Sequence, residues 1–242
     1  MFMRSYAYIS IIVILAFLLS LNTTKFFDFQ ETSLFLTVIG LIYGLISAFT
    51  INNAWERFSK IRDQIANETN SLIAAYLYSK HVSDKLTFNK LKTKIIEYCK
   101  EIPKIEWHNY WHSKKTHKKF RDIIEIISDM KLKNIKDIEL FDEISEELRS
   151  ASQARTSQLV LSRTRVSKMQ WILNIFLSLI LIIGLVFLQL PNYPLSIFII
   201  STMIISILMI LYVIYQMDSL KIGEEEVSTE PYNEVVNIIK YD

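Results

Sequence analysis

The side chains best suited to metal chemistry are histidines in the segment IEWHNYWHSKKTHKKF. His108 and His112 lie four residues apart, which places both imidazole rings on one face of a helix, and Glu106 is the nearest carboxylate. Tryptophans and lysines surround these histidines, and such a mixture is typical of an interfacial or packing segment. We therefore predict no metal site and no cofactor, with zinc or nickel at His108 and His112 as the alternative.

Residue patterns of enzymes are missing from the sequence. The one cysteine, Cys99, excludes an internal disulfide, and we expect it to be a free thiol that is buried in a core or lightly exposed. No glycine occurs between Gly44 and Gly184, so phosphate-binding loops and sharp catalytic turns are not expected. The run KKTHKK is followed by acidic residues, which is typical of a solvated helix. We predict neither enzymatic activity nor nucleic-acid binding.

The segment 33–53 carries the residues that could form a pore. Gly40 and Gly44 make a G-x-x-x-G pair, a spacing that lets helix backbones approach closely in lipid. Beside this pair, one slowly drifting helix face holds five residues that we call the neck stripe: Thr37, Leu41, Leu45, Ala48 and Asn52. A ring of such helices from several copies would form a hydrophobic constriction that gates by dewetting. Ordinary packing between membrane helices is the alternative.

Four segments are long and apolar enough to cross a bilayer, which takes about 20 residues. None of them contains Asp, Glu, Lys, Arg or His. This argues against an ion-coupled transporter, because such proteins usually keep a charged side chain inside the membrane. The first segment lacks a small-residue cleavage site after it, so we expect a retained anchor rather than a signal peptide. The segments are 6–21, 33–53, 171–190 and 194–215.

The distribution of charge predicts the orientation. Residues 54–170 hold 23 of the 27 basic residues against 16 acidic ones. The connection after the first segment has one lysine, and the turn PNYP between the last two segments has no charge. By the positive-inside rule, 54–170 and both termini should face the cytoplasm. The same basic excess would raise the local concentration of anions, which favours a preference for anions.

Helical periodicity continues outside the membrane segments. Apolar residues recur at three- and four-residue steps from Trp55 to Leu77, which predicts one unbroken helix of roughly 45 residues and about 65 Å. A similar stripe over 138–159 is predicted to run without a break into the third segment. Shorter helices are expected near 84–101 and 117–132.

These elements predict an all-α integral membrane protein with a cytoplasmic helical bundle. The tail is too polar to re-enter the bilayer, and we expect it to pack on the bundle or on a neighbouring subunit. The expected domains are a first transmembrane hairpin (1–53), a cytoplasmic helical domain (54–170), a second hairpin (171–216) and a cytoplasmic tail (217–242).

Three stretches resemble the bacterial bestrophin-like proteins. GLISAFTINNAWERFSKIRDQIANETNSL matches the family signature at Trp55, Glu56 and Arg57. ARTSQLVLSRTRVSKMQWILNIFLSLILIIGLVFL resembles the arginine-rich helix that leads to a tryptophan. In the tail, MDSLKIGEEEVSTEPYNEVV resembles the family motif at several positions: Asp218, Gly223, Val227, Ser228, Glu230 and Pro231. Two departures occur, because Ser219–Leu220 replaces a proline–aromatic pair and VSKM replaces the prolines before the third segment.

The resemblance implies kinship with bestrophins, pentameric ion channels whose second span lines a central neck above a cytoplasmic helical vestibule. It places Thr37, Leu41 and Leu45 at neck-lining positions, in a multi-pass protein of the bacterial cytoplasmic membrane. The expected partners are further copies of the chain, the lipid bilayer and permeant ions such as chloride. The acidic residues at 224–226 and 230 do not reproduce the calcium cluster of animal bestrophins, so we predict no calcium gating. A non-conducting membrane scaffold or sensor is the alternative.

Overall fold

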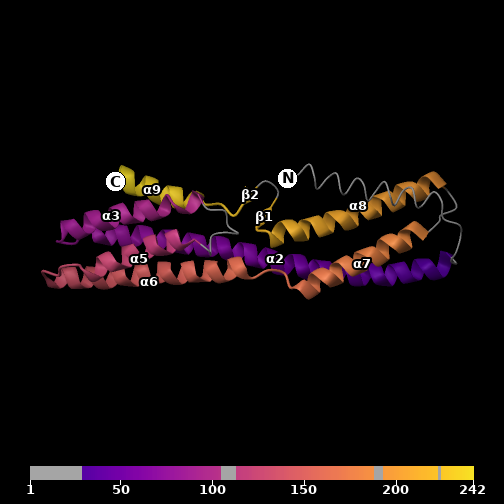
Figure 1. The fold of residues 1–242 in the computed structure, drawn as a ribbon, viewed down its shortest axis with the longest axis horizontal. Helices are drawn as coiled ribbons and strands as arrows, with labels where there is room; N and C mark the ends of the chain where they lie inside the picture. Colours follow the sequence, from indigo (N-terminus) through magenta and orange to yellow (C-terminus); the bar gives the residue numbers. More distant parts are fainter. Residues whose placement is uncertain (1–28, 105–112, 188–192, 223–224) are drawn as a thin grey trace. The chain divides into compact units, whose positions relative to one another are not determined.

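The computed structural model describes residues 29–104, 113–187, 193–222 and 225–242 (Figure 1). The described residues are helical, apart from connections and one ladder of two-residue strands, so the predicted all-helical class is confirmed. In the ladder, β1 (Lys221–Ile222) pairs with antiparallel β2 (Glu225–Glu226). The chain divides into two compact units. The apolar unit contains the described residues up to Trp55 and Val166–Asp218, and the bundle unit contains Glu56–Arg165 and Ser219–Asp242.

Helix α2 (Phe29–Ser79) runs for 51 residues without interruption. It contains no proline, and its only glycines are Gly40 and Gly44, so few residues in it oppose helix formation. Side chains 33–55 carry no charge, and charged residues recur from Glu56 onward. The predicted unbroken helix is confirmed and is somewhat longer than expected.

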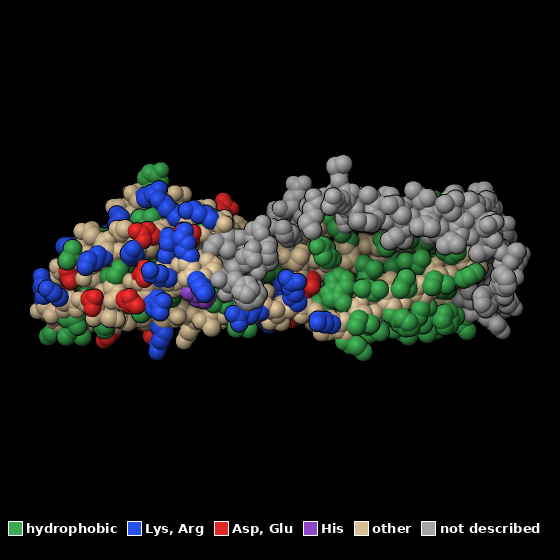
Figure 2. Space-filling model, in the orientation of Figure 1, with side chains coloured by type: hydrophobic (Ala, Val, Ile, Leu, Met, Phe, Trp, Pro, Cys, Tyr) green, Lys and Arg blue, Asp and Glu red, His purple; other side chains and the backbone are tan. Residues whose placement is uncertain are grey.

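The apolar unit combines the first part of α2 with α7 (Lys168–Phe187) and α8 (Tyr193–Asp218). Three helical stretches, which include these helices, are long and apolar enough to cross a membrane. Large hydrophobic side chains cover the outside of this unit on the face in Figure 2, as expected for contact with lipid. The predicted first span, 6–21, lies outside the described residues. The core of the unit is Leu36, Tyr43, Leu177, Leu181, Leu185, Val186, Ile200, Ile204 and Ile207.

The bundle unit packs four α-helices with the second part of α2. They are α3 (Lys85–Cys99), α5 (Lys114–Ser128), α6 (Ile135–Arg163) and α9 (Glu230–Tyr241), and a short 3-10 helix, η1 (Ile102–Lys104), follows α3. Polar side chains cap three of these helices at the N-terminus, because Asp84, Ser113 and Asn134 each accept backbone N–H bonds of the first turn. The helices predicted near 84–101 and 117–132 are thus confirmed as α3 and α5. Apolar residues of all five helices form one core.

The prediction that α6 continues into the third span is wrong. Helix α6 ends at Arg163, residues 164–167 are not helical, and α7 begins at Lys168. Thr164 has the extended dihedral ψ of 118°, which turns the chain out of the helix. The backbone N–H of Val166 then donates to Asp218 Oδ1 at 2.8 Å instead of to a carbonyl of the preceding turn.

The tail returns to the bundle unit after α8. Leu220 lies in the turn after α8 and has a left-handed φ of 59°, which costs a residue with a Cβ about 1 kcal/mol. Pro231 lies in the first turn of α9, where a proline is tolerated. Buried α9 residues then join the bundle core, which confirms the prediction that the tail packs there: Tyr232, Val235, Val236 and Ile239.

Candidate functional site

The neck stripe lies on one exposed face of α2. All five of its side chains are exposed, and none of them is charged. The buried residues of this part of α2 are Leu36, Tyr43, Ser47, Thr50 and Ala54. At 100° per residue, the centre of the neck stripe lies roughly 150° around the helix from the centre of this buried group. The structure therefore brings the five predicted residues together, on the side of α2 that faces away from the packing inside the apolar unit.

One apolar contact and one hydrogen bond hold the buried side of α2 against α7 and α8. Leu36 packs against Gly184 of α7, where an added Cβ would lie 2.3 Å from Leu36 Cδ2. The hydroxyl of Tyr43 donates to the backbone oxygen of Ile207 in α8 at 3.3 Å. The Leu36 side chain thus occupies the space that the absent side chain of Gly184 leaves open. Among the described residues, a Cβ added at Gly40 would make only an ordinary contact with Leu181, and one added at Gly44 would meet nothing within 4 Å outside its own helix. Close packing of this pair against another helix therefore stays a prediction.

A polar group that the sequence analysis missed joins α2 to α7. Asn174 is fully buried. Its Oδ1 accepts a hydrogen bond from Ser47 Oγ at 2.8 Å, and its Nδ2 donates to Thr50 Oγ1 at 3.1 Å. Nδ2 also donates to the carbonyl oxygen of Gln170 at 2.8 Å within α7. The signal was present in the sequence, since an asparagine inside an otherwise apolar span needs hydrogen-bond partners there.

Asp218, one of the family-motif residues, lies at the end of α8 and binds the residues at the start of α7. Its Oδ1 accepts from the backbone N–H of Val166 at 2.8 Å, and its Oδ2 accepts from Trp171 Nε1 at 3.3 Å. One carboxylate therefore fixes both the start of α7 and the end of α8. This gives the motif residue a structural role that a carboxylate performs well, because both of its oxygens are acceptors.

The other motif residues are dispersed. Trp55 is exposed, Glu56 forms a surface ion pair with Lys60 at 2.6 Å, and Arg57 is buried. Glu230 is exposed in the first turn of α9, where its charge is favourable at a helix N-terminus. Gly223 and the side chains of 224–226 lie outside the described residues.

A buried carboxylate at the centre of the bundle unit was also missed. Glu68 lies in α2 beyond its apolar run and is fully buried. Its carboxylate accepts hydrogen bonds from the hydroxyl of Tyr98, from Gln158 Nε2 at 2.6 Å and from the hydroxyl of Tyr232 at 2.7 Å. These donors come from α3, α6 and α9, so four helices meet at one side chain. Their separation along the sequence hides the cluster from any local pattern.

Arg155 supplies the positive charge of this cluster. It is buried, it donates to the hydroxyl of Tyr98, and its guanidinium lies 5.3 Å from the ring centroids of Tyr98 and Phe120. It also donates to Thr116 Oγ1 of α5 at 3.2 Å. Burial raises the pKa of Glu68, while the hydrogen bond from Tyr98 and the charge of Arg155 oppose that rise. Burial likewise raises the pKa of the Cys99 thiol, which is free and lies in the core, one of the two expected placements.

A second charged group ties the end of α3 to α5. Glu101 is buried and pairs with Lys115 Nζ at 2.6 Å and Lys119 Nζ at 3.0 Å. The hydrogen bonds from these two lysines lower the pKa of Glu101 to about 2. The pairing is structural, because both lysines bond to the same carboxylate and leave little of it accessible.

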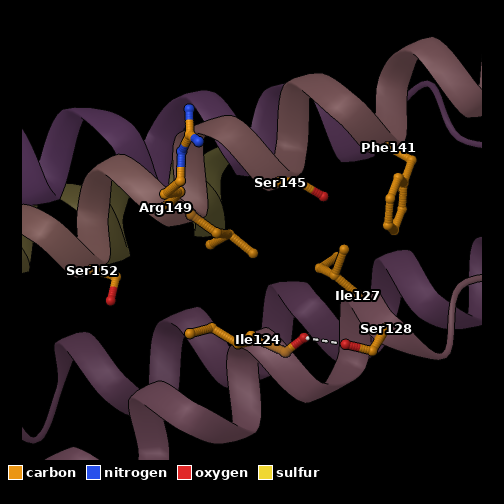
Figure 3. Close-up of a pocket in the computed structure, with 8 residues that line it drawn as sticks. Ile124, Ile127, Ser128, Phe141, Ser145, Arg149 and Ser152 are labelled. Atoms are coloured by element: carbon orange, nitrogen blue, oxygen red, sulfur yellow. Dashed lines mark hydrogen bonds between the residues drawn. The ribbon is translucent and has the colours of Figure 1, made fainter.

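An open groove lies between α5 and α6, with a volume of 310 Å³ (Figure 3). Its floor is apolar, and Ile127 and Phe141 lie on its two sides. Three serines and Arg149 line its edge, but the groove has no nucleophile beside a base. The described residues also contain no group of three metal-ligating side chains, and His108, His112 and Glu106 lie outside the described ranges. The groove is therefore a partly apolar hollow on the surface of the bundle unit.

Comparison with known protein families gives a match over most of the chain. A family model described as Bestrophin-like domain matches residues 8–232. No curated protein and no solved structure matches the chain. The matched range contains the neck stripe, Asn174, Asp218 and the buried cluster around Glu68.

Proposed function

The chain belongs to the bestrophin-like family, and from this membership we propose that it is an oligomeric, passive ion channel of the bacterial cytoplasmic membrane. Several copies, five by the resemblance, surround a central pore with their α2 helices. The neck stripe lines the narrowest part of that pore, and the bundle units form a cytoplasmic vestibule. The predicted partners are therefore copies of the same chain, lipid and permeant ions.

One observation carries this proposal. The neck stripe is exposed and uncharged, and it lies on the side of α2 opposite to the residues that pack against α7 and α8. From Thr37 to Asn52 it extends over about 22 Å, most of the thickness of a bilayer core. Leu41 and Leu45 occupy its middle, with polar residues at both ends. Such a profile suits a hydrophobic neck with hydrated entrances.

The basic residues support an orientation of the chain in the membrane and a preference of the channel for anions. The excess of lysine and arginine over residues 54–170 supports a cytoplasmic bundle unit with both chain termini on that side. Where these residues face the ion pathway, they raise the local anion concentration and favour chloride over sodium. The absence of charged side chains from α2 between 33 and 55 supports passive conduction.

Flux through purified protein in liposomes tests the proposal. Wild-type protein is expected to conduct chloride faster than sodium, and the L41A/L45A variant should alter conductance and selectivity because it widens the apolar neck. The matched control is L179A/L195A, which removes two leucines that are similarly exposed: Leu179 and Leu195 are 52% and 51% exposed, against 64% and 54% for Leu41 and Leu45. Equal flux and selectivity in wild type and L41A/L45A would contradict the neck assignment.

The mass of the assembly and the flux together separate the channel from the scaffold. A five-fold assembly that conducts ions supports the channel. An intact assembly with no flux of either ion would instead favour a scaffold or sensor acting through the bundle unit.

A further inference from the structure

We propose that Asn174 is the positioning residue that sets the rotation of α2 and so decides which residues face the pore. The inference rests on the proposed function, because it takes the neck stripe as the pore-lining face. It concerns the buried amide of α7 and the two α2 hydroxyls that it binds, Ser47 and Thr50.

The apolar part of α2 has no strong preference of its own for one rotation. Large hydrophobic side chains are exposed on several of its sides, including Val38, Ile42 and Phe49 in addition to Leu41 and Leu45. In water, a helix with a single apolar face turns that face toward the protein core. In lipid, an apolar side chain gains little by turning from the bilayer toward another helix, because lipid tails are equally apolar. Directional contacts must therefore fix the rotation.

Asn174 makes two directional contacts between α7 and α2, and Tyr43 adds a longer hydrogen bond from α2 to Ile207 of α8 at 3.3 Å. Ser47 donates to Oδ1 at 2.8 Å, and Thr50 accepts from Nδ2 at 3.1 Å, so the two ends of one amide hold two different hydroxyls. The hydroxyls are three residues apart, about 4.5 Å along the helix axis. Two attachment points at different heights oppose both rotation and sliding of α2. All three side chains are buried, where a lost partner is not replaced by water.

The bonds of Asn174 lie at the same level along α2 as part of the neck stripe. Ser47 and Thr50 lie in the same turns of α2 as Leu45, Ala48 and Asn52, on the opposite side of the helix. A rotation of roughly 90° would bring Ile42 and Phe49 into the place of the neck stripe. The aromatic ring of Phe49 would then narrow the pore.

The test measures how fast water-soluble reagents reach single cysteines along α2. Cys99 is fully buried, so the natural chain gives little background labelling. Cysteines are placed on the stripe (L41C, L45C) and off it (I42C, F49C), and the reconstituted protein is treated with a charged, membrane-impermeant methanethiosulfonate. With Asn174 intact, the stripe positions are expected to react faster than the off-stripe positions.

Two changes should remove that contrast. In the N174L background, and equally in S47A/T50V, we expect the ratio of stripe to off-stripe labelling rates to fall by about tenfold, because the interhelical bonds are lost. The triple variant N174L/S47A/T50V should lower the ratio of labelling rates no further than N174L alone, since all three changes remove the same contacts. The control T202V removes a hydroxyl that donates only within α8, to the oxygen of Phe198 at 2.8 Å, and should preserve the contrast.

The outcomes separate the two proposals. If the intact protein shows no contrast between stripe and off-stripe cysteines, the neck assignment itself fails. If the contrast is present but persists in both N174L and S47A/T50V, the neck stands and the role of Asn174 is refuted. A contrast lost in N174L but kept in S47A/T50V also refutes it, because the effect then comes from packing of the larger side chain and not from the bonds.

Discussion

The hydroxyl of Tyr232 donates to Glu68 Oε2 at 2.7 Å, so the C-terminal helix α9 is bonded to the buried carboxylate of α2. The residues are 164 positions apart in the sequence and both are fully buried. This bond gives the tail a specific docking point in the bundle unit, in addition to its apolar contacts.

The first prediction concerns this bond. Replacing Tyr232 with Phe keeps the ring but removes one donor from a buried carboxylate, so the free energy of unfolding should fall by about 1 to 3 kcal/mol. Chemical unfolding in detergent, followed by circular dichroism, measures the change. Y241F is the matched control in the same helix, because Tyr241 is 91% exposed, and its effect should stay within about 0.5 kcal/mol. Equal effects of the two variants would contradict a structural role for the bond.

The second prediction is a pH dependence at Glu68. Burial raises its pKa above the ordinary value of 4.5. A raised carboxyl pKa contributes stability below pH 4.5, and that contribution is lost as the pH rises through the folded-state pKa. The difference in unfolding free energy between wild type and E68Q should therefore decline as the pH rises from 4.5 and then level off. A difference that grows with rising pH would show that the partners of Glu68 outweigh its burial.

The third prediction has the opposite sign. The pKa of Glu101 is lowered from 4.5 to about 2 by Lys115 and Lys119, so its contribution is present above pH 4.5 and lost as the pH falls toward 2. The stability of wild type relative to E101Q should decrease over this window. In a K115M/K119M background the decrease should shrink, since the groups that lower the pKa are gone. An unchanged decrease in that background would assign the effect to another carboxylate.

The fourth prediction compares two glycines. In G184A, the new Cβ would lie 2.3 Å from Leu36 Cδ2, so we expect a loss of about 1 to 3 kcal/mol, partly restored by adding L36A. The Cβ of G44A meets nothing within 4 Å outside its own helix in the described part of the chain and should leave the fold of one copy intact. If Gly44 packs against a second copy, G44A should instead lower the mass of the assembly. Native mass spectrometry distinguishes these effects.

The fifth prediction concerns Asp218. D218A leaves the N–H groups of Val166 and Trp171 without this acceptor, so we expect the apolar unit to lose about 1 to 3 kcal/mol. D218N keeps one acceptor oxygen and should lose less. Thermal unfolding followed by tryptophan fluorescence measures both variants. E230A serves as the control from the same family motif, because Glu230 is exposed, and the loss of its charge at the N-terminus of α9 should cost only about 0.5 kcal/mol.

Much of the fold could be predicted because it depends on local composition. The apolar runs, the scarcity of glycine and proline, and the three- and four-residue spacing in α2 all lie within one helix length. The break after α6 could not be predicted in the same way. The sequence TRVS contains neither glycine nor proline, and the acceptor for the N–H of Val166 is 52 residues away.

The hydrogen bonds inside the site could not be predicted either, because their partners are also distant in the sequence. The neck stripe could be predicted from the residue spacing on one helix face, whereas Asn174 and Glu68 acquire their roles only from partners on other helices. Asn174 binds residues 124 and 127 positions away, and Glu68 binds residues 30, 90 and 164 positions away. A sequence pattern marks such polar residues as unusual in an apolar setting without naming their partners.

The chain passes between its two units at three junctions, after Trp55, after Arg165 and after Asp218. Only the first lies inside a continuous helix, since residues 164–167 are not helical and a turn follows α8. Asn52 and Ala48 of the neck stripe are therefore joined to the bundle unit by one uninterrupted helical backbone, whose geometry relates the rotation of Glu56 about the helix axis to that of the neck stripe.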